Sequence, residues 1–350
     1  MNESGQFIAN LLDSTAKAIA ATTVHCQTES SEAALPDGVR SQLTADTEIR
    51  LGYLAESLAA GCPELFVDHV HWLRRAYDAR GVPAELLVHN LRCLREQLIE
   101  SLPPGTHELA LAHLDAGLEA TRTALPAAPE PLDGGGPYAE LTRRFLLAQL
   151  EARRADAIGL LEEAAQSGTS IADLEVHVVS RAQHEMGRMW LRGEVRVAEE
   201  HLGSSIVEEA LGRLRSHIPA PADDARPLVV AAVGGNQHDI GARMVADHFA
   251  LAGWSPIYLG ADTPAEDVTW AAVEFGAQLV ALSAALGLQV RTVAALIAVL
   301  REQLPKIPIL VGGGPFARVP DLWRSVGADA SASDAGSAVS EAERLVGAGA

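Results

Sequence analysis

The sequence is short of lysine and of positive charge in general. Only Lys17 and Lys306 are lysines, and 27 basic residues face 46 acidic ones, which gives a formal net charge of −19. Residues 1–130 alone hold 9 basic and 18 acidic residues. A protein that binds nucleic acid directly needs a basic face to displace counterions from the phosphates. The charge balance therefore argues against nucleic acid as a direct partner.

Cysteines and long hydrophobic runs are scarce as well. Cys26, Cys62 and Cys93 are scattered and form no C-x-x-C pair, which argues against a zinc site or a disulfide scaffold and favours a reducing compartment. No run reaches the roughly 18–20 apolar residues of a membrane helix. The first residues lack the basic and apolar regions of a signal peptide. We therefore expect a cytoplasmic protein without a membrane partner.

Two proline- and glycine-rich segments, 125–137 and 219–227, interrupt the helical patterns and divide the chain. A domain usually takes about 100–200 residues, so two or three domains are expected. Residues 1–124 carry leucines at helical spacing and predict an all-helical sensor or interaction domain. Residues 138–218 predict a four-helix bundle.

The hydrophobic period changes in residues 227–350. Apolar runs at 228–233, 256–259, 279–283 and 309–311 alternate with helical stretches. This alternation is typical of βαβ units and a parallel sheet of the Rossmann or flavodoxin type. The predicted fold class is therefore multidomain, α and α/β. Ligands of such sheets bind beyond the carboxyl ends of the strands.

Three loops at those ends hold the candidate site. Residues 234–241 (Gly-Gly-Asn-Gln-His-Asp-Ile-Gly) follow the first run, residues 283–285 end the third, and residues 312–314 (Gly-Gly-Gly) follow the fourth. Taken singly they indicate a tight turn, a helix cap and a solvated histidine. The dinucleotide fingerprint G-x-G-x-x-G and the P-loop lysine are absent. The spacing of the three loops is more specific than any one of them.

Together these loops resemble the cobalamin-binding domain shared by methionine synthase, the mutases and corrinoid carrier proteins. That domain has D-x-H-x-x-G, then S-x-L, then G-G, at gaps that this chain matches: 41 residues separate Gly241 from Ser283, and 26 separate Ala285 from Gly312. The resemblance implies that His238 binds cobalt from below, a role that suits a neutral imidazole. The implied cofactor-binding residues of this domain are Asn236, Gln237, His238, Asp239, Ile240, Gly241, Ser283, Ala285, Gly312 and Gly313.

The resemblance also implies a role for each loop around the nucleotide tail. Ser283 would donate to the tail, Gly241 would let the next helix begin beside it, and residues 312–313 would leave its channel free of side chains. Two positions depart from the pattern. Asn236 stands where the family has an aspartate that accepts the second imidazole N–H, so we expect a weaker donor histidine. Ala285 replaces the leucine of S-x-L and loosens one wall.

The bundle carries a second pattern, in which Trp190 is followed after nine residues by Glu200-His201. By itself it indicates a core tryptophan and a solvated helix face. Beside the cobalamin motif it is similar to the cap signature of the adenosylcobalamin photoreceptors, which are light-responsive transcription repressors. There the tryptophan packs over the upper ligand and the Glu-His pair contacts the adenosyl group. The family's next residue is a histidine, here Leu191, so His184, His201 or water is left as the upper ligand after photolysis.

Residues 1–124 differ from the basic winged-helix module of those repressors. In this respect the chain looks more like the photocobilins, which pair cobalamin with a bilin. The segment 69–77 (His-Val-His-Trp-Leu-Arg-Arg-Ala-Tyr), followed by His89, Arg92 and Cys93, offers arginines for the propionates of biliverdin and rings for a flat tetrapyrrole. The alternative is an ordinary helical interaction domain.

These patterns predict a light-sensing signalling protein rather than an enzyme. It would bind adenosylcobalamin, with biliverdin as a second chromophore, and change conformation or homo-oligomeric assembly, as a dimer or tetramer, when light breaks the Co–C bond. One alternative is a corrinoid methyl-carrier subunit of a methyltransferase system, which would use the same His238 loop. Another is a module that senses cobalamin supply without light.

Overall fold

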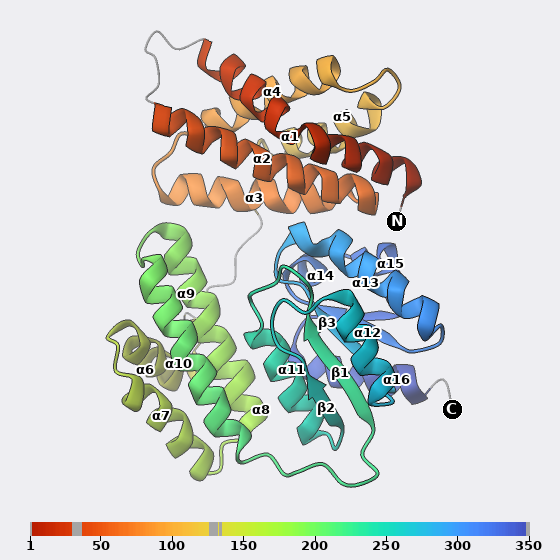
Figure 1. Cartoon of the computed structure of the whole chain (residues 1–350). Helices are drawn as coiled ribbons and strands as arrows, with labels where there is room; N and C mark the ends of the chain where they lie inside the picture. The colour runs from red at the N-terminus through yellow and green to blue at the C-terminus, as the bar shows by residue number, and fades with distance from the viewer. Residues whose placement is uncertain (1, 30–36, 126–131, 133–134, 348–350) are drawn as a thin grey trace. The chain divides into compact units, whose positions relative to one another are not determined.

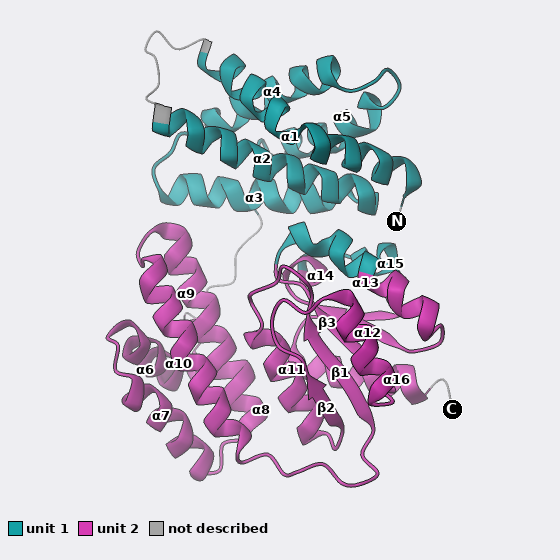
Figure 2. Ribbon diagram, viewed as in Figure 1, with its two compact units in different colours: residues 1–126, 286–295, 318–327 teal, residues 127–285, 296–317, 328–350 magenta. Residues whose placement is uncertain are grey.

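The computed structural model describes residues 2–29, 37–125, 132 and 135–347. It divides into two compact units, which Figure 2 shows in different colours. Unit 1 comprises Met1–Pro126, Leu286–Ala295 and Arg318–Gly327. Unit 2 comprises Ala127–Ala285, Leu296–Ala317 and Ala328–Ala350. The helical N-terminal region and the C-terminal parallel sheet confirm the predicted fold class.

The N-terminal part of unit 1 is entirely helical over its described residues (Figure 1). Its leucine pattern buries one continuous core, to which Leu54, Leu58, Phe66 and Leu91 contribute fully buried side chains. Apolar residues at helical spacing form this core because they lie on one face of each helix. The helices are α1 (Glu3–Glu29), α2 (Asp37–Ala60), α3 (Pro63–Ala79), α4 (Ala84–Ser101) and α5 (His107–Ala120).

A disulfide joins Cys26 of α1 to Cys93 of α4, with 5.9 Å between the Cα atoms. This bond departs from the expectation of a reducing compartment without disulfides; the two residues are 67 positions apart and belong to no spacing motif that would have indicated it. Cys62 is a free thiol. Burial is the main cause that raises the pKa of Cys62, to about 11, so this thiol is not activated.

Unit 2 begins with the predicted four-helix bundle. Its third helix contains a π-helical turn, η1 (Glu175–Val179), between two α-helical parts, and ends at Gly193, whose φ of +73° forms a left-handed cap. The bundle core includes the buried residues Phe145, Val178 and Leu211. The four helices are α6 (Ala139–Leu150), α7 (Arg154–Gln166), the third helix made of α8 (Ile171–Leu174), η1 and α9 (Ser180–Arg192), and α10 (Val197–Arg215).

The C-terminal domain is a parallel sheet of five strands in the order β2-β1-β3-β4-β5. The four predicted strands are confirmed, and a fifth of only three residues, which has no long apolar run, was not predicted. The strands are β1 (Pro227–Ala232), β2 (Ser255–Tyr258), β3 (Val280–Ser283), β4 (Ile309–Gly312) and β5 (Ala330–Ala332). The helices are α11 (Ile240–Leu251), α12 (Ala265–Glu274), α13 (Val290–Gln303), α14 (Gly314–Arg318) and α16 (Ala335–Gly347).

Two short elements complete unit 1 far from its N-terminal helices in sequence. They are the 3₁₀ turn η2 (Gly287–Gln289), together with the part of α13 up to Ala295, and α15 (Leu322–Ser325). None of the helices in the described part of the chain is long and apolar enough to cross a membrane.

Candidate functional site

The register of the sheet brings the three predicted loops together. Ala232 of β1 pairs with Ser283 of β3, and Ser283 pairs with Gly312 of β4. The three strands therefore end at the same level, and the segments 234–241, 283–285 and 312–314 leave the sheet side by side. This is the position at which parallel sheets bind their ligands.

Asn236 holds the first of these loops in place. Its side chain is fully buried, its Nδ2 donates to the carbonyl of Ser283 (3.0 Å), and its Oδ1 accepts from the backbone N–H of His238 (3.1 Å). The amide thus ties the histidine loop to the end of β3. Since Oδ1 has a second lone pair, the expected bond to the imidazole of His238 stays a prediction.

His238 projects from this fixed loop into solvent. Its side chain is exposed, and its ring has no hydrogen-bond or ion-pair partner among the residues that the structure describes. A buried or paired histidine would have to break contacts before it could bind a metal, whereas this ring is accessible on a restrained backbone. The residue therefore fits the role of an axial ligand to the cobalt of a cobalamin.

Asp262, in the loop after β2, is a residue of the site that the sequence analysis missed. Its Oδ1 accepts from the backbone N–H of Gly235 (2.6 Å) and its Oδ2 from Nε2 of Gln237 (3.1 Å). Its own N–H donates to the carbonyl of Asn236 (2.9 Å), and its φ of +49° is left-handed. The segment Gly-Ala-Asp-Thr-Pro directly after a strand was the available signal.

A second contact from β2 reaches the end of the same loop. The hydroxyl of Tyr258 donates to Oδ2 of Asp239 (2.6 Å). Burial and this bond raise the pKa of Tyr258 well above its usual range. Ile240, the next residue, is partly buried against the bundle core. The loop of His238 is therefore fixed from both β2 and β3.

The glycines of the site differ in whether the fold itself requires glycine at their positions. Gly313 has a φ of +98°, and a Cβ there would lie 2.0 Å from the carbonyl oxygen of Ala284, so the fold itself requires glycine. A Cβ on Gly312 would lie 3.2 Å from the carbonyl oxygen of Ala332. A Cβ on Gly241, by contrast, meets no atom within 4 Å. Of these three glycines, Gly241 is the one beside which the space that the resemblance assigns to a ligand is open.

Ser283 presents its side chain at the same edge. Its carbonyl oxygen accepts from the backbone of Val233 (3.1 Å) as well as from Asn236. No partner of its hydroxyl is recorded among the residues that the structure describes, so this hydroxyl can donate to a tail bound beside Gly241. Ala285 is half-buried two residues further on.

The predicted cap residues lie together at one end of the bundle. A Cβ on Gly203 would lie 2.9 Å from Cε of Met186, which sets α9 beside α10. Trp190 is one turn beyond Met186, and Glu200 is about one turn before Gly203, so the two are at the same level. Trp190 is partly buried against the bundle core, and Glu200 accepts from the hydroxyl of Ser204 (2.9 Å).

His201 follows Glu200 at this end of α10 and is exposed. Its side chain is 73% accessible, and its Nε2 lies 3.7 Å from Oε2 of Glu200. The pair is therefore present as a contiguous carboxylate and imidazole, as the sequence predicts.

The cap end of α10 extends past the loop of His238. The helices α10 and α11 run in the same direction, because Gly212 lies beside Arg243 and Arg215 pairs with Asp247. Glu200 precedes Gly212 by twelve residues, a rise of about 18 Å, whereas α11 begins only three residues before Arg243, a rise of about 4.5 Å. The start of α10, with the cap residues, therefore lies beyond the start of α11.

The comparisons with known proteins agree with this geometry. Residues 226–343 match the family model of a B12 binding domain, and residues 141–215 match a second model with the same description. A corrinoid protein of Desulfitobacterium hafniense is 29% identical over 209 residues, which cover 58% of this chain and 91% of that protein. The HTH-type transcriptional repressor CarA of Myxococcus xanthus is 26% identical over 243 residues, which cover 68% of this chain and 80% of the repressor.

A solved structure supports the fold. The monomethylamine corrinoid protein of Methanosarcina barkeri superposes with a TM-score of 0.52 at 24% identity, and covers 59% of this chain and 99% of its own. One conclusion follows from the two B12 binding domain matches, the corrinoid and repressor relatives, and the accessible histidine on a fixed loop. The chain is a cobalamin-binding protein.

Proposed function

We propose that this cobalamin-binding protein is a light sensor that binds adenosylcobalamin, and that it signals rather than catalyses. The observation that carries the proposal is the cap: Trp190 and Glu200 lie at one level of the bundle, beyond the start of α11. A methyl carrier does not need side chains that cover the upper face of the corrin, because that face must reach partner enzymes. The similarity to a transcriptional repressor over 68% of the chain supports a regulatory role.

The lower side of the site is proposed to hold the cobalt and the nucleotide tail. His238 would ligate cobalt through an imidazole whose backbone is fixed by Asn236 and, through Gln237, by Asp262. The hydroxyl of Ser283 would donate to the tail, and the open space at Gly241 would admit it. No side chain of this set has to act as a general acid or base.

The upper side is proposed to hold the adenosyl group. Adenosylcobalamin supplies a Co–C bond that visible light breaks. The carboxylate of Glu200 would accept from the ribose hydroxyls, and the indole of Trp190 would exclude water from the bond. After photolysis, His201, which is exposed at this level, His184 or water would be left to fill the upper position, because Leu191 offers no ligand.

Loss of the adenosyl group would let the bundle move over the sheet domain. The bundle packs on α11 through α8 and α10, so a shift of the cap is transmitted to the helix that begins at the histidine loop. Such a two-state element, biased by one ligand, would change the conformation or the homo-oligomeric assembly of the protein.

The test is an absorbance spectrum and an elution volume of the protein, loaded with adenosylcobalamin in the dark, before and after green light. We expect both to change, and we expect Trp190→Ala to accelerate photolysis while Trp270→Ala, at an exposed position of α12, does not. Methylcobalamin and hydroxocobalamin serve as controls. A spectrum that ignores green light would overturn the proposal.

The corrinoid relatives favour a second candidate, a methyl-carrier subunit. It would use the same histidine loop but prefer methylcobalamin to adenosylcobalamin, and it would transfer the methyl group to a partner enzyme. Equal affinity of wild type and Glu200→Gln for adenosylcobalamin, together with tighter binding of methylcobalamin, would support this candidate against the light sensor.

Biliverdin as a second chromophore stays a prediction. Arg74, expected to bind a propionate, donates instead to the carbonyls of Ala120 (2.7 Å) and Thr123 (2.8 Å). His69 is buried and stacked on Tyr53, with 3.7 Å between ring centroids. Cys93 is in the disulfide. His71, His89 and Arg92 remain as candidate contacts, and far-red absorbance after incubation with biliverdin and desalting is the measurement that decides.

A further inference from the structure

Both loops that border the proposed tail site continue directly into unit 1. Ala285 is followed by Leu286–Ala295, and α14, which follows Gly313, ends at Arg318, where the second segment, Arg318–Gly327, begins. These two segments pack with the N-terminal helices rather than with the domain from which they emerge in sequence (Figure 2). The N-terminal helices therefore hold the continuation of each loop.

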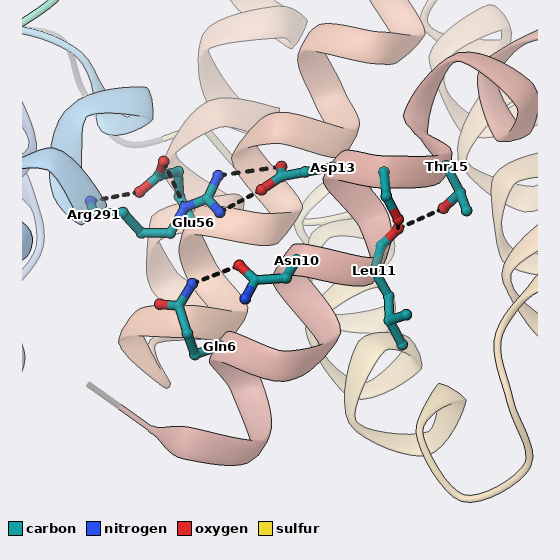
Figure 3. Close-up of polar contacts among 8 residues, drawn as sticks. Gln6, Asn10, Leu11, Asp13, Thr15, Glu56 and Arg291 are labelled. Carbon is teal, nitrogen blue, oxygen red and sulfur yellow. Dashed lines mark hydrogen bonds and ion pairs between the residues drawn. The ribbon is translucent and has the colours of Figure 1, made fainter.

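Arg291 makes the main polar contact of the first segment. Its backbone N–H donates to Oε2 of Glu56 (2.8 Å) and its Nε to Oε1 of the same carboxylate (2.9 Å). Its two Nη atoms donate to the carboxylate of Asp13, at 2.6 and 3.3 Å (Figure 3). One arginine thus joins α1, α2 and the first turn of α13.

The carboxylate of Glu56 also completes the beginning of α13. The first N–H groups of a helix have no partner within it, and the helix dipole favours a negative charge there. Arg291 is the second residue of α13, and its N–H is bound by Glu56, a side chain from α2. The start of α13 is therefore completed by a residue of the N-terminal helices.

The backbone beside this contact approaches the N-terminal helices closely. A Cβ on Gly287 would lie 2.8 Å from Cε1 of Tyr53 and 3.2 Å from Cδ1 of Leu65. In the second segment, Nε of Arg318 donates to both carboxylate oxygens of Asp68 at 3.0 Å. Close packing and ion pairs therefore hold the segments Leu286–Ala295 and Arg318–Gly327 against the N-terminal helices.

The ion pair of Glu56 with Arg291 is better suited to fix the position of α13 against α2 than to add stability to the fold. The Glu56 side chain is 3% accessible, and its burial raises the pKa of this carboxyl to about 7 in spite of the arginine. A buried ion pair often adds little net stability, because desolvation offsets the attraction. Arg291 is 22% accessible and keeps its ion pair with Asp13, so Glu56→Gln leaves no unpaired buried charge and should leave the fold intact.

We propose that Glu56 and Arg291 are positioning residues that couple occupancy of the tail site at Ser283–Ala285 to the N-terminal helices. The inference rests on the proposed binding of cobalamin at this edge and names the path by which it reaches α1 and α2. By reciprocity, a contact that depends on the bound tail must also affect the affinity for the cofactor.

The test is the dissociation constant for adenosylcobalamin in the dark, measured for wild type, Glu56→Gln, Arg291→Gln and the double variant. We expect each single variant to bind about 5- to 30-fold more weakly. The double variant should bind no more weakly than the weaker single variant, because both changes remove one contact. Arg95→Gln, which breaks the Arg95–Asp115 pair (2.8 Å) within the same unit, should bind as wild type.

A second measurement separates coupling from a merely structural role. Hydrogen exchange in α1 and α2 around Asp13 and Glu56 should slow when cobalamin binds to wild type, and should not respond in Glu56→Gln. Gly287→Ala, which places a methyl group against Tyr53, tests the same contact without a change of charge, with Gly38→Ala as its control in α2.

The outcomes are distinguishable. Variants that bind like wild type, with the same change in exchange, would overturn the coupling and leave cobalamin binding standing. A wild-type protein that binds no cobalamin would overturn the proposed function together with the coupling.

Discussion

Arg215 at the end of α10 and Asp247 in α11 form an ion pair with 2.8 Å between Nη1 and Oδ1. Behind it, Glu175 of the π-helical turn is fully buried, and neither of its carboxylate oxygens has a hydrogen-bond donor among the described residues. Oδ2 of Asp247 is in the same condition. Burial, together with the charge of Asp247, raises the pKa of Glu175 and so favours a proton shared between the two carboxyls, while Nε2 of His248 lies 3.4 Å from Oε2 of Glu175.

This cluster predicts a pH dependence of stability. Burial, followed by the charge of Asp247, raises the pKa of Glu175 above its unfolded value of 4.5, against the opposing charges of Arg243 and Arg215. The folded state therefore holds the proton more tightly, and the contribution of Glu175 to stability is full below pH 4.5 and shrinks as the pH rises. Burial lowers the pKa of the adjacent His248, so the window above pH 6.5 isolates the carboxyl.

Glu175→Gln should therefore gain thermal stability relative to wild type by about 2–4 °C per pH unit between pH 6.5 and 9. Melting followed by circular dichroism checks this, with the exposed Glu163→Gln as the control. A difference between variant and wild type that is independent of pH would contradict the shared proton.

His238→Gly is expected to remove the lower cobalt ligand without disturbing the loop, whose contacts are made by Asn236, Gln237 and Asp239. Changes to the residues that hydrogen-bond a metal ligand already cost about 10- to 100-fold in metal affinity, so loss of the ligand itself should cost at least as much. Added imidazole should restore the visible spectrum. Unchanged colour and affinity without imidazole would place the cobalt ligand elsewhere.

Asp262→Asn should loosen the histidine loop while it keeps the left-handed backbone, which asparagine tolerates. One side-chain oxygen remains to accept from Gly235, and the bond to Gln237 is weakened. We expect cobalamin affinity to fall about 3- to 10-fold, in line with the usual contribution of one hydrogen bond. Titration by absorbance measures it, with the exposed Asp267→Asn as the control.

Gly313→Ala and Gly241→Ala should change different properties of the protein, its stability and its affinity for cobalamin respectively. An alanine at 313 adopts a left-handed φ and meets the carbonyl of Ala284, so we expect a loss of stability of about 1–3 kcal/mol. An alanine at 241 meets no atom of the protein, so stability should be unchanged while affinity for cobalamin falls. Urea unfolding and cobalamin titration of both variants test this. Full affinity of Gly241→Ala would show that the tail does not occupy that space.

The sequence determined the order of helices and strands and the spacing of the binding loops. Runs such as 228–233 and 279–283 are local signals, and parallel strands can end only at a common edge, so the meeting of His238, Ser283 and Gly312 followed from the chain alone. The tryptophan and Glu-His of the cap were likewise visible as a spacing on two successive helices.

The tertiary structure decided the contacts that join distant segments. No periodicity or spacing in the sequence indicates the contacts of Asp262, the Cys26–Cys93 disulfide or the ion pair of Glu56 with Arg291. Gly313 illustrates the difference: the sequence marked it as part of a ligand channel, and the fold shows a backbone that approaches Ala284 too closely for any side chain. Local patterns are set by neighbours along the chain, whereas these contacts depend on which surfaces meet once the helices and strands have packed.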